Sequence, residues 1–330
     1  MSSCLEQRRR GPLSASRRYY PGFFGALFLI LLRIAIGWHF LYEGLEKFDS
    51  MQRGGKPFSA EPYLRNATGP LAPYFRGMVP DVNGLAMLDP ARLNAGWAAE
   101  VERLTQHYGL NQDQKEKAKA LLDKAEAEAK IWQQDKEQTE KQNKYIRDLR
   151  EVQAIEHKRG ALSFERERAH AKRKDLDTDR KAVLEPYKAI ETRLVEGVTN
   201  LATPEQRESA GRYKPPMTSL DWVNLSTTWG LMLMGACLIL GLFTRLAALA
   251  GAVFLAQIYM SMPPWPGLPP NPLAEGHYFI VNKNLVELLA CLVIASTPSG
   301  HWIGLDALLF GRSRRRRELA AEEAEAERQH

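Results

Sequence analysis

Residues 23–45 read FFGALFLILLRIAIGWHFLYEGL, an apolar run interrupted by two charged residues, Arg33 and Glu43. A helix must run about 20 residues to cross the apolar core of a bilayer, and this run is long enough. The run is too long for a signal peptide, and no small-residue cleavage pattern follows it. We therefore expect a retained transmembrane helix. It is preceded by a basic segment with Arg8, Arg9, Arg10, Arg17 and Arg18.

Two further apolar stretches predict three more crossings. Residues 225–262 are too many for one span, and GLFTR at 241–245 breaks them, which favours two spans joined by a tight turn. The last span is expected over about 279–297, after PPWPGLPPNP, a segment through which no helix can continue. The predicted fold class is all-α: an integral membrane four-helix bundle with a long helical insertion between the first and second spans.

Basic residues at both ends of the chain predict its orientation. Four crossings place both termini on one side, and the positive-inside rule makes that side cytoplasmic. Arg245, in the short connection between spans two and three, agrees with this orientation. The insertion is then extracytoplasmic, because long loops are translocated largely regardless of their charge. The basic residues near the carboxyl end are Arg312, Arg314, Arg315, Arg316 and Arg317.

Residues 91–201 are rich in Ala, Glu, Lys, Gln and Arg, which are good helix formers. Apolar residues recur there at helical spacing in narrow stripes, which suits helices packed on one another. We expect a shorter helix near 93–108 and then two long helices that turn near Gly160, as an antiparallel coiled-coil hairpin. Pro186 is expected to kink or restart the second long helix.

The charge of the insertion has two interpretations, a solvated helix face or a docking surface for a partner protein. The net charge of the chain is +6. The basic clusters flank apolar runs and do not interleave with aromatic residues, which argues against nucleic-acid binding. His107, His157 and His170 lack the spacing of metal ligands, so we predict no zinc site.

The first span carries a polar face formed by Arg33, His39, Glu43 and Lys47, which fall within an arc of about 120° at 100° per residue. Ionisable residues inside a membrane segment are costly and commonly mark a function. His39, Glu43 and Lys47 are four residues apart, which permits a stacked series along the helix. The alternative is that Lys47 reaches the outer surface and Glu43 only neutralises it.

The fourth predicted span carries a second polar set, with Asn284, Glu287 and Cys291 on one face. Glu43 and Glu287 are both expected in the outer half of the membrane, where two facing carboxyl groups would form a protonatable site. A quinone needs an apolar slot and a few groups that bond its carbonyl oxygens. Trp38, Tyr42 and Trp229 are expected either to line such a slot or to act as interfacial anchors.

Three segments carry a resemblance to a known family: RIAIGWHFLYEGLEKF from Arg33, LILGLFTRLAALAGAVFLA from Leu238, and NKNLVELLACLVIASTPSGHWIGLD from Asn282. They resemble the spans of the DoxX/DoxD family of bacterial membrane proteins, over roughly the first fifty residues and 220–310. The shared patterns are G-x-x-K-F at the end of the first span, a glycine followed by x-x-T-R, and a terminal G-x-x-x-L-D, here with one extra residue. The matching positions are Arg33, Gly37, Glu43, Gly44, Lys47, Gly241, Arg245, Asn284, Glu287 and Asp306.

The resemblance implies a four-helix bundle in a bacterial inner membrane and kinship with the small subunit of thiosulfate:quinone oxidoreductase. It implies a quinone-linked redox subunit that oxidises a sulfur compound or another small donor together with a partner. No haem, flavin or iron–sulfur motif is present in the sequence, so a partner is expected to supply any such cofactor. The insertion is far longer than the first loop typical of the family.

These observations define four regions: a basic terminus with the first span (1–49), the insertion (50–217), the remaining spans (218–310) and a charged tail (311–330). Glu43 and Glu287 are the candidate proton-handling carboxylates. The alternative functions are a non-enzymatic membrane-anchored scaffold, whose hairpin at 91–201 or cytoplasmic ends bind a partner protein, and a small proton-coupled transporter. The candidate substrate-binding residues are Arg33, Trp38, His39, Lys47, Arg245 and Asn284.

Overall fold

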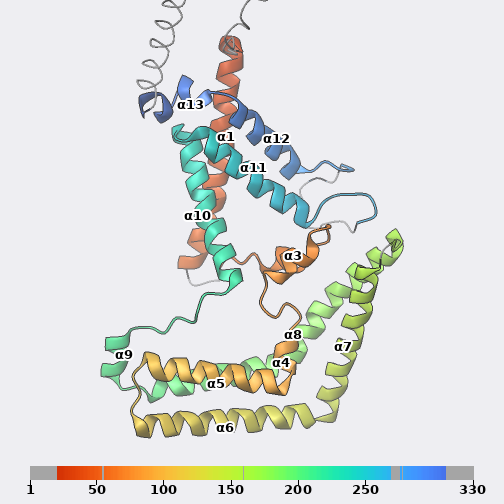
Figure 1. Cartoon of the computed structure of the whole chain (residues 1–330), viewed down its shortest axis with the longest axis vertical. Helices are drawn as coiled ribbons and strands as arrows, with labels where there is room; N and C mark the ends of the chain where they lie inside the picture. The colour runs from red at the N-terminus through yellow and green to blue at the C-terminus, as the bar shows by residue number, and fades with distance from the viewer. Residues whose placement is uncertain (1–20, 54–55, 159, 269–275, 277, 310–330) are drawn as a thin grey trace, which may run out of the picture. The chain divides into compact units, whose positions relative to one another are not determined.

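The computed structural model describes residues 21–53, 56–158, 160–268, 276 and 278–309. Every regular element in these ranges is a helix, numbered α1 to α13 (Figure 1). The basic terminal segments, including the charged tail at 311–330, lie outside the described residues. The chain divides into two compact units. We call them the apolar unit (1–49, 228–254 and 287–330) and the insertion unit (50–227 and 255–286).

Among the described residues, three helices are long and apolar enough to span a membrane. They are α1 (Gly22–Gln52), α10 (Ser219–Leu240) and α11 (Thr244–Ser261). The predicted first span is confirmed as a helix, although α1 continues past residue 45 for two more turns. The predicted break at 241–245 is also confirmed, because α10 ends at Leu240 and Gly241 takes a positive φ of 65°.

The predicted fourth span is shorter than expected. The helix there, α12 (Lys283–Ser296), has 14 residues. At 1.5 Å per residue it covers about 21 Å, less than the apolar core of a bilayer. Tyr278 and Val281 form an isolated bridge before it, which takes residues 278–281 out of the helix. A short helix, α13 (Ser299–Trp302), follows it.

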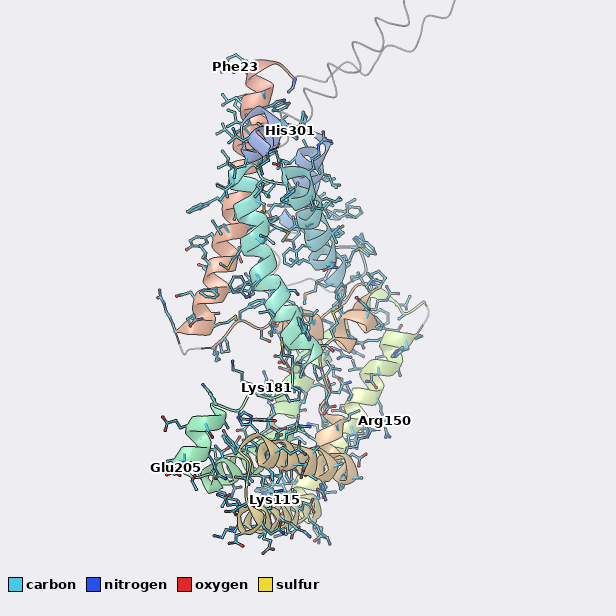
Figure 2. All side chains as sticks on the ribbon, turned by 60° about the vertical axis from the view of Figure 1, so that its left-hand side comes forward. Phe23, Lys115, Arg150, Lys181, Glu205 and His301 are labelled. Atoms are coloured by element: carbon cyan, nitrogen blue, oxygen red, sulfur yellow. The ribbon has the colours of Figure 1, made fainter. Side chains whose placement is uncertain are left out.

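The insertion unit begins with the short helices α2 (Glu61–Arg65), α3 (Ala72–Gly77) and α4 (Leu85–Leu88). Its main helices follow, and the short α9 (Pro204–Ala210) closes the series. Lys115, Arg150, Lys181 and Glu205 mark its charged surface in Figure 2. The main helices are α5 (Pro90–His107), α6 (Gln112–Gln134), α7 (Lys136–His157) and α8 (Ser163–Leu201).

The predicted helix near 93–108 is confirmed as α5, and the predicted turn near Gly160 is confirmed between α7 and α8. The prediction that the first long helix of the hairpin is continuous is wrong, because two helices meet at Asp135 instead. Asp135 ends α6 with an extended backbone, and its side chain accepts a hydrogen bond from Gln138 N–H as the N-cap of α7. An N-cap of this kind begins a new helix in a new direction.

α8 continues through Pro186, where we expected a kink or a restart. Before Pro186, its residues Leu176 and Val183 pack with α7 in one apolar cluster. After it, Tyr187 and Ile190 belong to a second cluster with α5 and α6. Figure 1 shows α8 running first beside α7 and then beside α5 and α6. The proline therefore lies where the packing partner of α8 changes.

Candidate functional site

α1 and α10 approach each other closely because glycines face each other at their crossing. A Cβ at Gly37 would lie 2.9 Å from Leu238 Cβ, and one at Gly235 would lie 2.4 Å from the backbone nitrogen of Leu41. Small residues of this kind let transmembrane helices pack backbone against backbone. The glycines thus fix the close crossing of α1 and α10 within the apolar unit.

Phe40 of α1 joins α11 and α12 at the same level. A Cβ at Gly251 would meet the Phe40 ring at 2.6 Å, and the Cys291 sulfur would lie 3.5 Å from it. Phe40 and Cys291 are almost fully buried. α12 is therefore packed into the apolar unit, although it is shorter than a full crossing.

Arg33 is the most deeply buried charged side chain of the apolar unit among the described residues, with 1% of its surface exposed. Its Nη1 donates a hydrogen bond to the carbonyl oxygen of Ser299 at 3.0 Å. The carboxylate of Asp306 also interacts electrostatically with the guanidinium group. A buried charge needs such compensation, because transfer from water without it costs several kcal/mol.

Asp306 ties the carboxyl-terminal segment to the turn between α10 and α11. Its Oδ1 accepts the backbone N–H of Phe243 at 2.7 Å, and its Oδ2 accepts that of Thr244 at 3.0 Å. In return, the N–H of Asp306 donates to the carbonyl oxygen of Gly241 at 2.9 Å. A carboxylate at the beginning of a helix satisfies N–H groups that have no partner within the helix. Asp306 therefore acts as the cap of α11.

We call Arg33, Thr244, Ser299 and Asp306 the arginine–aspartate cluster. Three of its buried polar atoms have no hydrogen-bond partner among the described residues: Arg33 Nε, Thr244 Oγ1 and Ser299 Oγ. The glycine at position 300 allows this close packing, since a Cβ there would lie 2.2 Å from Thr244 Oγ1. Such close packing suits a structural joint better than a ligand site.

A second polar contact joins α1 to α12. His39 Nε2 lies 3.6 Å from Glu287 Oε1, and the two side chains are 36% and 21% exposed. The distance falls within ion-pair range but exceeds a hydrogen bond. This contact brings together two of the predicted site residues, and each retains access to the surface of the apolar unit.

Glu43 and Lys47 form an ion pair one turn further along α1, with Oε2 and Nζ at 2.5 Å. Lys47 Nζ also donates to the carbonyl oxygen of Glu43. The carboxylate of Glu43 is therefore engaged by Lys47, whereas that of Glu287 lies near His39.

Four of the five remaining predicted residues are exposed. Trp38 is 61% exposed, and Arg245 is exposed at the start of α11. Asn284 is half-buried and belongs to the insertion unit. Tyr42 and Trp229 are exposed as well, and Trp229 packs edge-to-face on Phe48 at 5.6 Å. Exposed aromatic rings of this kind match the interfacial-anchor interpretation better than a slot lining.

Sequence reasoning missed two members of the arginine–aspartate cluster. Thr244 stands inside the GLFTR turn, so its position beside a helix start was available as a signal. Ser299 contributes its backbone carbonyl group. Every residue has such a group, so the residue type gives no signal. Among the described residues, no three His, Cys, Asp or Glu side chains gather as a metal-binding group.

A quinone would find partial complementarity at the His39–Glu287 contact. The imidazole and carboxyl groups provide the hydrogen-bonding capacity that quinone carbonyls need, and they lie on helices whose other surface is apolar. The chain was also compared with known proteins. No protein-family model, no curated protein and no solved structure matches it.

Proposed function

We propose that this chain is a membrane subunit of a quinone-linked redox system, in which His39 and Glu287 bind the quinone and handle its proton. The contact between His39 Nε2 and Glu287 Oε1 carries the proposal. It joins a basic and an acidic side chain from two helices at a partly exposed place in a unit whose helices are predominantly apolar. Ionisable groups in such surroundings are costly and commonly have a function.

The chemistry of the two side chains fits proton transfer. Imidazole carries two ring nitrogens, so it can accept a proton at one and donate a hydrogen bond from the other. A carboxylate beside the ring can fix its orientation. A bound quinone supplies reversible two-electron, two-proton chemistry. His39 would hydrogen-bond one carbonyl oxygen and hold the proton there, while Glu287 would compensate the charge.

The membrane arrangement that we propose is a four-helix bundle in a bacterial inner membrane, with α12 as the fourth helix. Among the described residues, three helices meet the length requirement for a span. Support for α12 comes from its packing on Phe40 and Gly251 through Cys291. The segment after it also returns to the α10–α11 turn through Asp306. We place both termini in the cytoplasm and the insertion outside, from the basic residues at the ends of the sequence.

The proposed substrate is a sulfur compound or another small donor that a partner subunit oxidises. The proposed partner carries the electron-transfer cofactor, because the sequence contains no motif for haem, flavin or an iron–sulfur cluster. This part of the proposal depends on the resemblance to the DoxX/DoxD family. The structural support for the proposal is the contact between His39 and Glu287.

The proposal is tested with the full chain purified in detergent. Adding a ubiquinone analogue should raise the unfolding temperature, because a ligand that binds the folded state stabilises it. His39→Gln and Glu287→Gln should each reduce that shift by more than half. Glu46→Gln is the matched control, since Glu46 is an exposed carboxylate on the same helix. The proposal fails if all four proteins respond equally to the analogue or if none responds.

A scaffold role remains the second candidate, favoured by exposed apolar side chains on the insertion unit. Ile131 of α6, Phe164 of α8 and Leu162, the N-cap of α8, are each more than half exposed. Solvent-exposed residues of this size on a solvated helix suit contact with a partner protein. A photo-crosslinking residue at Ile131 in the full chain should capture a specific partner in native membranes, whereas one at Lys115 should not. Equal labelling at both positions would reject this role.

A further inference from the structure

The insertion unit contains a cavity lined by three arginines. It is small and opens to solvent, with about 20 Å³ of space for the centre of a water-sized molecule, and its lining includes Arg65, Arg173 and Arg180. These side chains are unusually buried for arginine, with residue exposures of 8%, 8% and 9%. Asp177 is the only carboxylate in the lining. Positive charge therefore predominates on the cavity wall.

The protein compensates this charge only in part. Asp177 Oδ1 accepts hydrogen bonds from Arg180 at 3.0 and 3.3 Å and from Arg65 at 3.4 Å. Its Oδ2 pairs with Lys181 at 2.7 Å. One carboxylate thus serves three cations. Arg65 has a second acidic partner in Glu61, but Arg180 and Lys181 share Asp177 alone among the described residues.

Donor groups also remain available at the cavity. Arg173 uses Nε and Nη2 in a bidentate bond to Glu156, and Arg180 uses the same two nitrogens on Asp177. The Nη1 groups of both arginines have no hydrogen-bond acceptor among the described residues. Asn83 belongs to the same lining. Guanidinium groups present several N–H donors in a fixed plane, which suits the oxygens of phosphate or sulfate.

The elements that hold the arginines are well fixed. Arg65 ends α2 and donates from Nη1 to the carbonyl oxygen of Val82 at 2.7 Å. Tyr145 of α7 donates its hydroxyl hydrogen to the carbonyl oxygen of Asn83 at 2.6 Å. Arg173 and Arg180 project from α8 two turns apart. The cavity is therefore organised before any ligand arrives, which reduces the entropic cost of binding.

We propose that this cavity binds a compact tetrahedral oxyanion, a phosphate or sulfate group, between Arg65, Arg173 and Arg180. The group comes either from a free inorganic ion or from the headgroup of an anionic lipid. Its negative charge would complete the compensation that Asp177 provides in part. Asp177 competes with the ligand for Arg65 and Arg180, so its removal should favour binding.

The test measures anion binding to the full chain in detergent by isothermal titration calorimetry and by the unfolding temperature. Inorganic phosphate and sulfate are compared with chloride at matched ionic strength. Both oxyanions should bind and stabilise the protein, and Arg180→Gln should weaken binding by about tenfold or more, the loss of one charge-assisted contact. Lys181→Gln is the matched control, because Lys181 is exposed and lies outside the cavity lining. It should change the affinity by no more than about twofold.

Asp177→Asn separates a binding site from a purely structural cluster of ion pairs. An anion site predicts tighter phosphate binding in this variant and recovery of its unfolding temperature as phosphate is added. A structural cluster predicts a destabilised protein whose unfolding temperature is the same in phosphate and in chloride. That second result, or equal behaviour of phosphate and chloride with the unaltered protein, would overturn the proposal.

The source of the group is decided with nanodiscs. Discs that contain phosphatidic acid are compared with discs of phosphatidylcholine alone, each with and without inorganic phosphate. A lipid source predicts stabilisation by phosphatidic acid that Arg180→Gln abolishes and that added phosphate does not increase. A free ion predicts stabilisation by inorganic phosphate in both kinds of disc.

Discussion

Arg33 Nη1 donates a hydrogen bond to the carbonyl oxygen of Ser299 across 266 residues of sequence. The bond joins the first apolar helix to the segment after the last one, at the turn where α10 passes into α11. Asp306 binds the same turn through two backbone N–H groups. One buried cation and one buried carboxylate thus hold three distant segments of the apolar unit together.

Removing the cation should destabilise the apolar unit strongly. Arg33→Leu deletes the bond to Ser299 and leaves Asp306 without its compensating charge, at a cost of about 3 kcal/mol or more. Thermal unfolding in detergent should show a large decrease for this variant. Arg245→Gln, which changes an exposed arginine next to the same turn, should alter stability by less than about 0.5 kcal/mol.

The electrostatic part of that effect is measured by a double-mutant cycle. Arg33→Leu should cost less in an Asp306→Asn background, because the uncompensated negative charge is then absent. Equal costs in both backgrounds would show that Arg33 acts through its packing and its bond to Ser299 alone.

Two glycines of α10 should respond oppositely to alanine. At Gly235 the new methyl group would lie 2.4 Å from Leu41 N, so Gly235→Ala should separate α1 from α10 and cost about 1–3 kcal/mol. At Gly230 no atom lies within 4 Å of the new group. Gly230→Ala should be neutral or stabilise the helix by up to about 1 kcal/mol. Protease resistance and thermal unfolding in detergent measure both effects, and similar losses in the two variants would contradict the close crossing.

The stability of the insertion unit should fall as the solution becomes acidic. Burial, together with the positive charges of Lys174 and two arginines, lowers the pKa of His170 below its ordinary value of 6.5. As the pH falls below 6.5, the unfolded chain takes up a proton at His170 before the folded chain does. The unfolded state then binds more protons, so stability decreases with decreasing pH until the folded pKa is passed.

This dependence is measured by following helix unfolding with circular dichroism from about pH 7.5 to 5.5, the range around an ordinary histidine pKa. His170→Gln should flatten the decrease. His157→Gln, which alters an exposed histidine of α7, should keep the slope of the unaltered protein. An unchanged slope in His170→Gln would assign the pH dependence to other groups.

Replacing Glu191 should stabilise the insertion unit at neutral pH. Burial and the nearby negative charge of Glu100 raise the pKa of Glu191 above 4.5, so its ionised form is unfavourable in the folded state. Glu191→Gln should therefore gain a few tenths of a kcal/mol, and the gain should disappear as the pH falls through the raised pKa. Glu196→Gln, on the exposed face of the same helix, should show no such gain when unfolding is measured at neutral and acidic pH.

Much of the helical organisation was predictable from local patterns. The apolar runs predicted α1, α10 and α11, and the turn at GLFTR was correctly placed, because glycine supplies the positive φ that ends α10. The division of the first insertion helix at Asp135 was missed. The signal was present, since an aspartate can cap a new helix, but the residues on both sides favour helix so strongly that a continuous one was expected.

The sequence by itself determined which segments are helical, which of them are apolar enough for a membrane, and that α1 carries a polar face. These properties depend on the spacing of residue types along one segment. Only the tertiary structure decided that Arg33 meets the backbone of Ser299, that His39 lies beside Glu287, and that three arginines surround one cavity. Such contacts join residues far apart in the chain. The carbonyl that accepts from Arg33 is a backbone group that every residue type has, so neither residue type nor periodicity predicts it.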